Sequence, residues 1–500
     1  MATSELFLLS WPPSRDQIRL IPLLAVLYIL TRSIYHVYFD ALSAYPGPKS
    51  WAASDLPRTS HLLKGDLPYK LIELHKKYGP VVRIGRRFLS YSTPDAWNDI
   101  YAKVRPELSR DPKAFSPPPN GVYGLGVNPS DTDHSRLRRN FSHGFTDKAL
   151  RGQEPILTRY FDSLILKLKE HCANGPVDLS KFFNFVTVDI IGDLTFGQSF
   201  DCLENSALHS WVQNMFDFLK GFVIIGVCMS NPPLDSLVLS LGSKLFAKQE
   251  EVHRGFVRER VAKRLQMKDT RPDFITYAQS HLDTSAGISV EELEETCVSF
   301  TLAGSETTAS LLTGAVYHLL KNPAILERLS KEIRTTFSTE DNINMTSVTS
   351  LKYEHAVIEE SLRIFPPVAN QLPRITGPEG NVIAGRFVPP RTLVSISQKA
   401  CYSSAENFRD PDKFAPERWL GDEYYKDDRK KALQAFSVGP RNCIGVNLAY
   451  VEMRVILARL LWNFDMKLCE ESKDWSDGTK VFMIYQRKPL MVELTPVAMD

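Results

Sequence analysis

Residues 436–445 read Phe436-Ser-Val-Gly439-Pro-Arg441-Asn-Cys443-Ile-Gly445, and this stretch is the most informative in the chain. A single cysteine lies between two glycines, with an arginine two residues before it. Residues 448–461 then have a helical pattern, and the dipole and free N–H groups at a helix N-terminus favour a thiolate. Glycine lets the backbone approach a large flat ligand, and Arg441 can meet a carboxylate. We therefore interpret Cys443 as a functional thiolate, although an isolated cysteine is usually a small buried core residue.

The composition is that of an ordinary globular protein. Of its 500 residues, 43% are hydrophobic and 24% are charged, which excludes a disordered, collagen-like or coiled-coil chain. There are 60 Lys and Arg residues against 58 Asp and Glu, and the net charge of +2 disfavours a dedicated nucleic-acid-binding protein. The 7 cysteines show no C-x-x-C spacing, which disfavours a disulfide scaffold and a structural zinc site.

An apolar segment near the N-terminus indicates a membrane anchor. Leu20–Leu30 has no polar group except the hydroxyl of Tyr28, and residues 20–39 match the roughly 20 residues needed to cross a bilayer. Arg32 can extend to the lipid headgroups. A cleaved signal peptide and a buried core helix are the alternatives, but no convincing cleavage site follows. Pro46-Gly-Pro48 stops the helix and marks the hinge to the body.

The rest of the chain predicts one large domain, mainly α-helical with small β-sheets. No linker rich in Pro, Gly or Ser divides it after the hinge, so we expect an anchor at residues 1–44 and a single domain at residues 45–500. Helical patterns occur at residues 133–150, 156–172, 211–227 and 290–320, and short β-like segments at residues 81–84, 393–397 and 480–485.

The loop around Cys443 matches the pattern F-x-x-G-x-R-x-C-x-G, and the chain thereby resembles the cytochrome P450 family. The resemblance implies that residues 45–500 form a haem-binding cytochrome P450 catalytic domain. It implies that Cys443 is the axial ligand of the iron of haem b, and that Phe436, Arg441 and Gly445 belong to the haem-binding loop. A thiolate ligand donates electron density to the iron and favours cleavage of the O–O bond.

A second motif, Ala303-Gly-Ser-Glu306-Thr307-Thr308, lies within the longest expected helix. It resembles the oxygen-activating segment of the family, which implies that Thr307 holds water beside bound dioxygen and that Glu306 is its acid partner. A hydroxyl can both donate and accept hydrogen bonds. Gly304 is expected to leave room for oxygen and water. Without the resemblance, Glu-Thr-Thr within a helix would indicate a solvated face.

Two further motifs follow in the order typical of the family. Glu360-Ser-Leu-Arg363 comes first, and Pro416-Glu-Arg418-Trp419 comes later. The resemblance implies that Glu360, Arg363 and Arg418 form a buried cluster that supports the haem loop and takes no part in catalysis. An acid and a base three residues apart are by themselves common on helix surfaces. Trp419 stands where the family more usually has phenylalanine.

The two propionates of haem require cations, for which the resemblance suggests Arg138, Arg374 and Arg441. Arg138 belongs to His134-x-x-x-Arg138, where many members of the family have tryptophan in place of the histidine. His134 is therefore expected to supply the polar contact that tryptophan usually makes, with an ordinary helical histidine as the alternative.

Analogy with the family also suggests which residues contact a substrate. Because nearly all of them are apolar, we expect a lipophilic substrate that arrives from the bilayer, although each is equally compatible with a place in the core. The whole chain resembles fungal membrane-bound members that modify secondary metabolites, and terpenoid, polyketide and alkaloid substrates all stay open. The candidates are Phe115, Tyr123, Phe300, Ala303, Val368 and Phe482, with the apolar stretch 211–227 expected to cover the pocket.

The resemblance implies a monooxygenase that inserts one atom of O2 into an organic substrate. No flavin or nucleotide motif occurs, so NADPH-derived electrons must come from a partner, NADPH–cytochrome P450 reductase, with cytochrome b5 as a further candidate. We expect a single-pass anchor in the endoplasmic reticulum membrane, a cytosolic catalytic domain and no nucleic-acid partner. A docking patch for the reductase is expected at Arg136, Arg139, Arg429, Lys430 and Lys431, although a solvated run of charges would look the same.

Two other functions are compatible with the haem loop. A haem-thiolate isomerase or dehydratase would use no dioxygen, and a haem sensor or carrier would perform no chemistry. The intact pair Glu306-Thr307 argues against the first, and the apolar pocket segments argue against the second.

Overall fold

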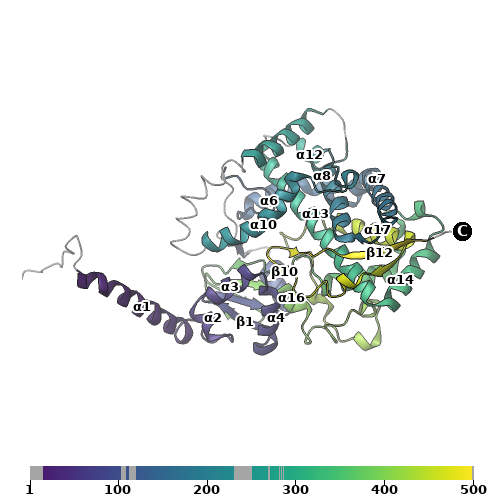
Figure 1. Cartoon of the computed structure of the whole chain (residues 1–500). Helices are drawn as coiled ribbons and strands as arrows, with labels where there is room; N and C mark the ends of the chain where they lie inside the picture. The colour runs from purple at the N-terminus through teal and green to yellow at the C-terminus, as the bar shows by residue number, and fades with distance from the viewer. Residues whose placement is uncertain are drawn as a thin grey trace, which may run out of the picture.

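The structure is a computed structural model that describes residues 15–102, 108–111, 120–229, 251–267, 271–280, 282, 284 and 287–497. The expected fold class is confirmed. Helices dominate the described part of the chain, and short strands form small sheets at its edges (Figure 1).

The helices and strands have the following bounds. The helices are α1 Arg15–Tyr38, α2 Lys49–Ala53, α3 Leu56–Lys64, α4 Leu67–Tyr78, α5 Asp95–Trp97, α6 Asp131–Ser142, α7 Asp147–Cys172, α8 Leu179–Phe196, α9 Cys202–Asn205, α10 Ser210–Met229, α12 Phe274–Gln279, α13 Val290–Lys321, α14 Pro323–Thr336, α15 Lys352–Ile364, α16 Gln398–Tyr402 and α17 Val446–Asn463, with a further helical segment at residues 251–266. The strands are β1 Val81–Gly85, β2 Phe88–Tyr91, β3 Ser109–Arg110, β4 Val177–Asp178, β5 Arg374–Ile375, β6 Asn381–Ile383, β7 Arg386–Val388, β8 Leu393–Ile396, β9 Phe464–Leu468, β10 Lys480–Val481, β11 Tyr485–Gln486 and β12 Met491–Pro496.

The long helix α13 runs through the middle of the body, with α8 packed along it (Figure 1). A capping box starts α13: Ser289 Oγ accepts from the amide of Glu292 at 3.2 Å, and Glu292 Oε2 accepts from the amide of Ser289 at 2.9 Å. At Gly304 the two helices approach so closely that a Cβ atom would lie 2.6 Å from Cδ1 of Ile191. The expectation that Gly304 leaves room for oxygen and water is therefore wrong, because Ile191 fills the space beside it.

The largest of the sheets has five strands in the order β1-β2-β8-β5-β3. Strands β2 and β8 pair in parallel, and the other neighbours pair antiparallel. The remaining strands form the sheet β4-β12-β9 and the hairpins β6-β7 and β10-β11. The single β-segment expected at residues 480–485 is the hairpin β10-β11, because the amide of Phe482 donates to the carbonyl of Ile484 at 3.1 Å and turns the chain.

The helix expected at residues 133–150 is two helices. α6 ends at Ser142, and a 3₁₀ turn at His143–Phe145 follows. Thr146 then caps α7, since its Oγ1 accepts from the amide of Ala149 at 3.3 Å. A threonine cap satisfies an amide that has no partner inside the helix and so begins a new helix within an unbroken helical pattern.

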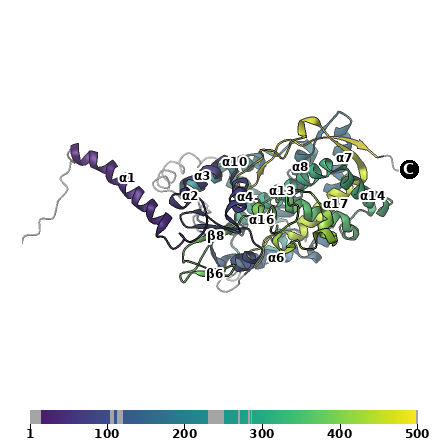
Figure 2. The same ribbon diagram turned by 90° about the horizontal axis from the view of Figure 1, so that it is seen from below.

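Helix α1 projects away from the body (Figure 2). Its segment Leu20–Tyr38 is long and apolar enough to cross a membrane, with a mean hydropathy of 1.6. The last turn is joined to the body by Arg83, which is 1% exposed: Nη1 donates to the carbonyl of His36 at 2.8 Å and Nη2 donates to that of Arg86 at 2.6 Å. Because carbonyls in the last turn of a helix lack partners inside it, Arg83 satisfies one of them and fastens α1 to β1.

Replacing Gly304 by alanine should lower the free energy of unfolding by about 1–3 kcal/mol. Overpacking against Ile191 outweighs the gain of up to about 1 kcal/mol in helix propensity. Chemical denaturation of the haem-loaded protein measures this loss. Ile191→Val removes Cδ1, so the double variant should lose less stability than the sum of the two single losses, and simple additivity would contradict the contact.

Candidate functional site

Residues 436–445, which we call the cysteine loop, are closed by backbone hydrogen bonds. The amide of Cys443 donates to the carbonyl of Phe436 at 2.9 Å, and the amide of Asn442 donates to that of Gly439 at 3.1 Å. α17 begins at Val446, directly after the loop. The side chain of Cys443 is accessible to water, although protein surrounds it on most sides. The loop thus presents one thiol beside the N-terminus of a helix.

The cysteine loop needs glycine at position 439 for two reasons. Gly439 has φ of +79°, a conformation that side chains disfavour. A Cβ atom there would also lie 2.0 Å from the carbonyl oxygen of Tyr101. The loop therefore packs directly onto the backbone of the π-helical turn Asn98–Ala102.

The surroundings of Cys443 act on its charge in opposite directions. Burial raises the pKa of the thiol, whereas a hydrogen bond from the backbone of Gly445 and the charge of Arg138 lower it. Burial is the largest of these effects and leaves the pKa of the Cys443 thiol above its ordinary value. The contacts with Gly445 and Arg138 oppose burial, because both favour the anionic form of the sulfur.

Arg138 fastens the cysteine loop to α6. Its Nη1 donates to the carbonyl of Asn442 and its Nη2 to Oδ1 of the same residue, each at 2.7 Å. One guanidinium therefore holds both the backbone and the side chain of the residue that precedes Cys443.

Four arginines lie around His134, which is buried in α6. Burial and the charges of Arg441, Arg110, Arg138 and Arg374 lower the pKa of His134 to about 3. His134 is therefore neutral at physiological pH and adds no charge of its own. The cluster unites the three arginines expected from the sequence. Arg441 is paired with Asp131, since its Nη2 lies 2.5 Å from Oδ1, and the other arginines leave an excess of positive charge that suits a ligand with carboxylate groups.

Sequence analysis missed Arg110 as a member of this cluster. The register of β3 and β5 places Arg110 directly opposite Arg374, and like charges in that position destabilise a sheet. An anion bound between them would remove this repulsion. Arg110 lies on a strand of two residues that pairs with a strand far away in the sequence, so no local pattern identifies it.

Thr307 and Ala303 share one face of α13. Thr307 Oγ1 donates to the carbonyl of Ala303 at 2.5 Å. Ala303 is exposed and Thr307 is partly exposed, whereas Ser305 and Thr308 are buried. The accessible side of this buried helix is therefore the side that carries Thr307, and its hydroxyl oxygen can still accept a hydrogen bond.

Glu306, by contrast, is buried and paired with a cation. Its Oε2 accepts from Nη2 of Arg487 at 2.8 Å. Arg487 lies 181 positions further along the chain and belongs to no motif, so sequence analysis did not identify it. The acid expected to assist Thr307 is thus held by an arginine from the C-terminal region.

Glu360, Arg363 and Arg418 lie together and are fully buried. Arg363 Nη2 lies 2.7 Å from Glu360 Oε1, and Arg418 Nε lies 3.0 Å from Glu360 Oε2. The indole of Trp419 also donates to Glu360 Oε2, at 2.9 Å, a bond that phenylalanine would not make. Burial raises the pKa of Glu360, but the two arginines and the other hydrogen bonds outweigh it and hold that pKa below its ordinary value.

This cluster is linked to the cysteine loop through Tyr402. Arg363 Nη1 donates to the carbonyl of Tyr402 at 3.0 Å, and the hydroxyl of Tyr402 accepts from the amide of Gln434 at 3.2 Å. Gln434 precedes the cysteine loop by two residues. The ion pair of Arg363 with Glu360 is therefore connected through two further hydrogen bonds to Gln434, just before the loop.

Two of the substrate candidates, Phe115 and Phe300, have different outcomes. Phe115 lies outside the described residues. Phe300 is 7% exposed and packs against the rings of Phe141, Phe145 and Phe274, with ring centroids 5.2 to 5.4 Å away. This placement favours the core alternative for Phe300.

The other substrate candidates are more accessible, with one exception. Tyr123 and Val368 are partly exposed, and Ala303 is exposed. Phe482 is buried, and its ring lies against Gly65 at the end of α3. Its carbonyl accepts a hydrogen bond from the side chain of Asn370, which ties the β10-β11 hairpin to the chain after α15.

Arg136 of the expected docking patch is partly exposed and paired with an acid. Its guanidinium pairs with Glu292 Oε1 at 2.6 Å and joins α6 to the start of α13. Arg139 and Lys431 are exposed. Arg429 pairs with Asp95 Oδ2 at 3.1 Å near the surface.

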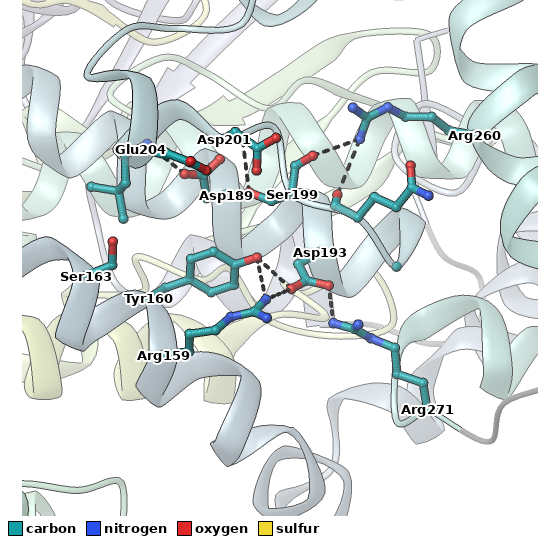
Figure 3. A pocket seen from close by; sticks show the side chains of 13 residues that line it. Arg159, Tyr160, Ser163, Asp189, Asp193, Ser199, Asp201, Glu204, Arg260 and Arg271 are labelled. Atoms are coloured by element: carbon teal, nitrogen blue, oxygen red, sulfur yellow. Dashed lines mark hydrogen bonds and ion pairs between the residues drawn. The ribbon is translucent and has the colours of Figure 1, made fainter.

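A polar cavity of about 590 Å³ lies between α7, α8 and the helical segment at residues 251–266 (Figure 3). Asp193 accepts from the hydroxyl of Tyr160 and from Nη2 of Arg159, each at 2.6 Å, and pairs with Arg271. None of the site residues expected from the sequence lines this cavity. The carboxylate of Asp193 at its centre is neutralised by neighbouring arginines. These contacts join helices to one another, and we interpret them as structural.

Comparison with known proteins agrees with this geometry. The family model for Cytochrome P450 matches residues 48–494. The chain is 41% identical to cytochrome P450 monooxygenase astA of Talaromyces wortmannii, over 95% of this chain and 96% of that protein. It is 41% identical to cytochrome P450 monooxygenase aclL of Aspergillus oryzae, over 94% and 97% respectively. It is 39% identical to averantin hydroxylase of Dothistroma septosporum, over 95% and 90%.

The chain therefore belongs to the cytochrome P450 family of haem-thiolate monooxygenases. The expected resemblance to fungal monooxygenases of secondary metabolism is confirmed by these relatives. The residues of the site suit the haem group that the family implies. The cysteine loop offers a sulfur donor beside a glycine-bracketed backbone, and the arginine cluster offers partners for two carboxylates.

Trp419→Phe should lower the free energy of unfolding by about 1.5–3 kcal/mol, because it removes a hydrogen bond to a buried carboxylate and keeps an aromatic ring. Denaturation followed by far-ultraviolet circular dichroism measures the loss. Trp462→Phe is the matched control, since that indole donates to the neutral carbonyl of Phe337 at 3.4 Å. The control should lose about 0.5–1.5 kcal/mol, and equal losses would contradict a charge-assisted bond to Glu360.

Proposed function

We propose that this monooxygenase inserts one oxygen atom into a lipophilic substrate of fungal secondary metabolism at a haem b group bound through Cys443. The observation that carries the proposal is the cysteine loop, which presents the Cys443 thiol beside the N-terminus of α17 and next to a cluster of arginines, with Gly445 and Arg138 favouring its anionic form. Haem, when bound there, supplies the activation of dioxygen and the transfer of one of its atoms to the substrate.

In this proposal the chain holds haem at its centre and at its edge. Cys443 binds the iron, and the amide of Gly445 moderates the charge on the sulfur. Phe436 closes the loop through its carbonyl. The propionates are held by the four arginines around neutral His134, one more than the sequence predicted: Arg110, Arg138, Arg374 and Arg441.

Proton delivery is the task proposed for Thr307 and Glu306. The hydroxyl of Thr307 donates to the carbonyl of Ala303 and so turns its lone pairs towards the accessible side of α13. A water molecule held there by the Thr307 oxygen stands where a proton is needed. Glu306, one residue earlier, is the acid that resupplies this water.

A lipophilic substrate is supported by the apolar character of the accessible candidates. Tyr123, Ala303 and Val368 combine aromatic and aliphatic surface with a single hydroxyl. The relative from Dothistroma septosporum is named a hydroxylase of averantin. We propose hydroxylation of a lipophilic compound of the terpenoid, polyketide or alkaloid class.

Electrons are proposed to come from NADPH through NADPH–cytochrome P450 reductase, with cytochrome b5 as a second donor. The basic residues Arg139, Lys430 and Lys431 fit an acidic partner surface. We propose that residues 1–44 anchor the enzyme in the endoplasmic reticulum membrane and that residues 45–500 form its cytosolic domain. Phe387 is 56% exposed, and its carbonyl accepts a hydrogen bond from the hydroxyl of Tyr45, just before the hinge. This exposed ring supports a membrane surface at this end of the body.

Labelled dioxygen tests the function directly. Extracts of producing cells with and without the enzyme should differ by a product that carries one labelled oxygen atom, and its formation should require NADPH. Mass spectrometry measures the incorporation. An unlabelled product that forms without NADPH would replace the proposal by an isomerase or dehydratase.

Thr307→Ala should raise the peroxide released per NADPH oxidised and lower the rate of water formation. The loss should be at most about 100-fold, the lower end of the range for a positioned proton donor, because other waters still carry some protons. Turnover with purified reductase and without added substrate measures both quantities. Thr301→Ala is the control, since its hydroxyl makes the same type of bond to the carbonyl four residues earlier but is fully buried. Equal behaviour of the two variants would exclude Thr307 from proton delivery.

A further inference from the structure

The ion pair between Arg487 and Glu306 joins three parts of the chain in the interior. Arg487 follows β11, and its side chain is 5% exposed against 6% for Glu306. Its Nη2 donates to Glu306 Oε2 at 2.8 Å and to Asn184 Oδ1 of α8 at 2.7 Å. Its Nη1 donates to Thr313 Oγ1 of α13 at 3.4 Å. The guanidinium therefore lies between α8, α13 and the C-terminal segment.

Two of these contacts do not involve Glu306. Asn184 and Thr313 hold the guanidinium in place whatever the protonation state of the carboxyl group. Arginine stays charged in proteins and offers five donors in a fixed planar fork. Arg487 is thus a fixed positive charge to which the side chain of Glu306 is directed, and it sets the position of that carboxylate.

The direction of Glu306 matters because its neighbour faces elsewhere. Successive residues of a helix point about 100° apart. Thr307 lies on the accessible side with Ala303, whereas Glu306 points to the buried side that Arg487 and α8 share. A proton from Glu306 reaches water at Thr307 only if the carboxyl group turns away from Arg487 and then returns.

We propose that Arg487 is a positioning residue for proton supply, an inference that rests on the proposed roles of Glu306 and Thr307. The O–H bond of protonated Glu306 breaks while a new O–H bond forms on the water held by Thr307, and that water releases one of its own protons towards the place where oxygen is reduced. The carboxylate that results is attracted back to Arg487, and a hydronium ion from solvent protonates it again and leaves as water. Arg487 gives up no proton; it stabilises the charged carboxylate and fixes the place to which it returns.

The test uses the full-length, haem-loaded protein with purified NADPH–cytochrome P450 reductase and no added substrate. The ratio of NADPH to dioxygen consumed distinguishes reduction to peroxide from reduction to water. Arg487→Gln should lower the rate of water formation roughly 3- to 10-fold, less than the loss of a general acid, because Glu306 is still present. Lys488→Gln is the matched control: Lys488 is the adjacent cation, is exposed, and its ammonium group donates to the carbonyl of Asp477, so the ratio should stay at the parent value.

Conservative and double variants separate positioning from packing. Arg487→Lys keeps the charge and should recover most of the parent ratio. It also replaces the glutamine variant in the test if that variant folds poorly. Adding Arg487→Gln to Glu306→Gln should lower water formation no further than Glu306→Gln alone. In denaturation, the stability lost through Arg487→Gln should be smaller in the Glu306→Gln background than in the parent, which is a readout independent of turnover.

The outcomes that overturn the proposal are distinct. If Glu306→Gln lowers water formation and Arg487→Gln leaves it unchanged, Glu306 supplies protons without help from Arg487. If the two losses multiply in the double variant, Arg487 acts elsewhere. If Glu306→Gln itself has no effect, the proposed role of Glu306 and the positioning role of Arg487 are both wrong.

Discussion

The carboxylate of Glu360 is the interaction on which the arrangement of the site depends. Burial disfavours its charge, and Arg363 and Arg418 restore the charge by direct contact. Removing one partner of such a cluster leaves an uncompensated buried charge, which costs about 3–5 kcal/mol. Because Arg363 also holds Tyr402 and Tyr402 holds the amide of Gln434, order is transmitted from the carboxylate to the cysteine loop. The position of the cysteine loop is thus linked to a salt bridge in α15.

A second buried carboxylate follows the same physics for a different purpose. Glu306 meets one guanidinium where Glu360 meets two, and it adjoins a residue that faces the accessible side of α13. A carboxylate with a single cation can leave its partner at lower cost than one held from several sides. Glu360 is therefore held from two sides and suits a structural role, whereas Glu306 is the acid that we propose for proton supply.

Much of the site could be predicted because its signals are local in the sequence. The cysteine loop and the pairs Glu360–Arg363 and Glu306–Thr307 are short strings that match motifs of the family, and the two pairs gain their meaning only from that match. Arg110 and Arg487 could not be predicted, because strand pairing and the packing of α8 on α13 bring them to the site from distant positions. The sequence could not show that Ile191 from another helix fills the space expected beside Gly304. Periodicity likewise could not locate the break between α6 and α7, because the cap at Thr146 depends on one hydrogen bond.

Pro46-Gly-Pro48 was expected to act as a hinge between α1 and the body. The contact between Arg83 and the last turn of α1 instead makes this connection stiff. A buried guanidinium that holds the carbonyls of His36 and Arg86 resists bending between the helix and the body. A change in the tilt of α1, such as a bilayer of different thickness imposes on a spanning helix, would therefore turn the body with it.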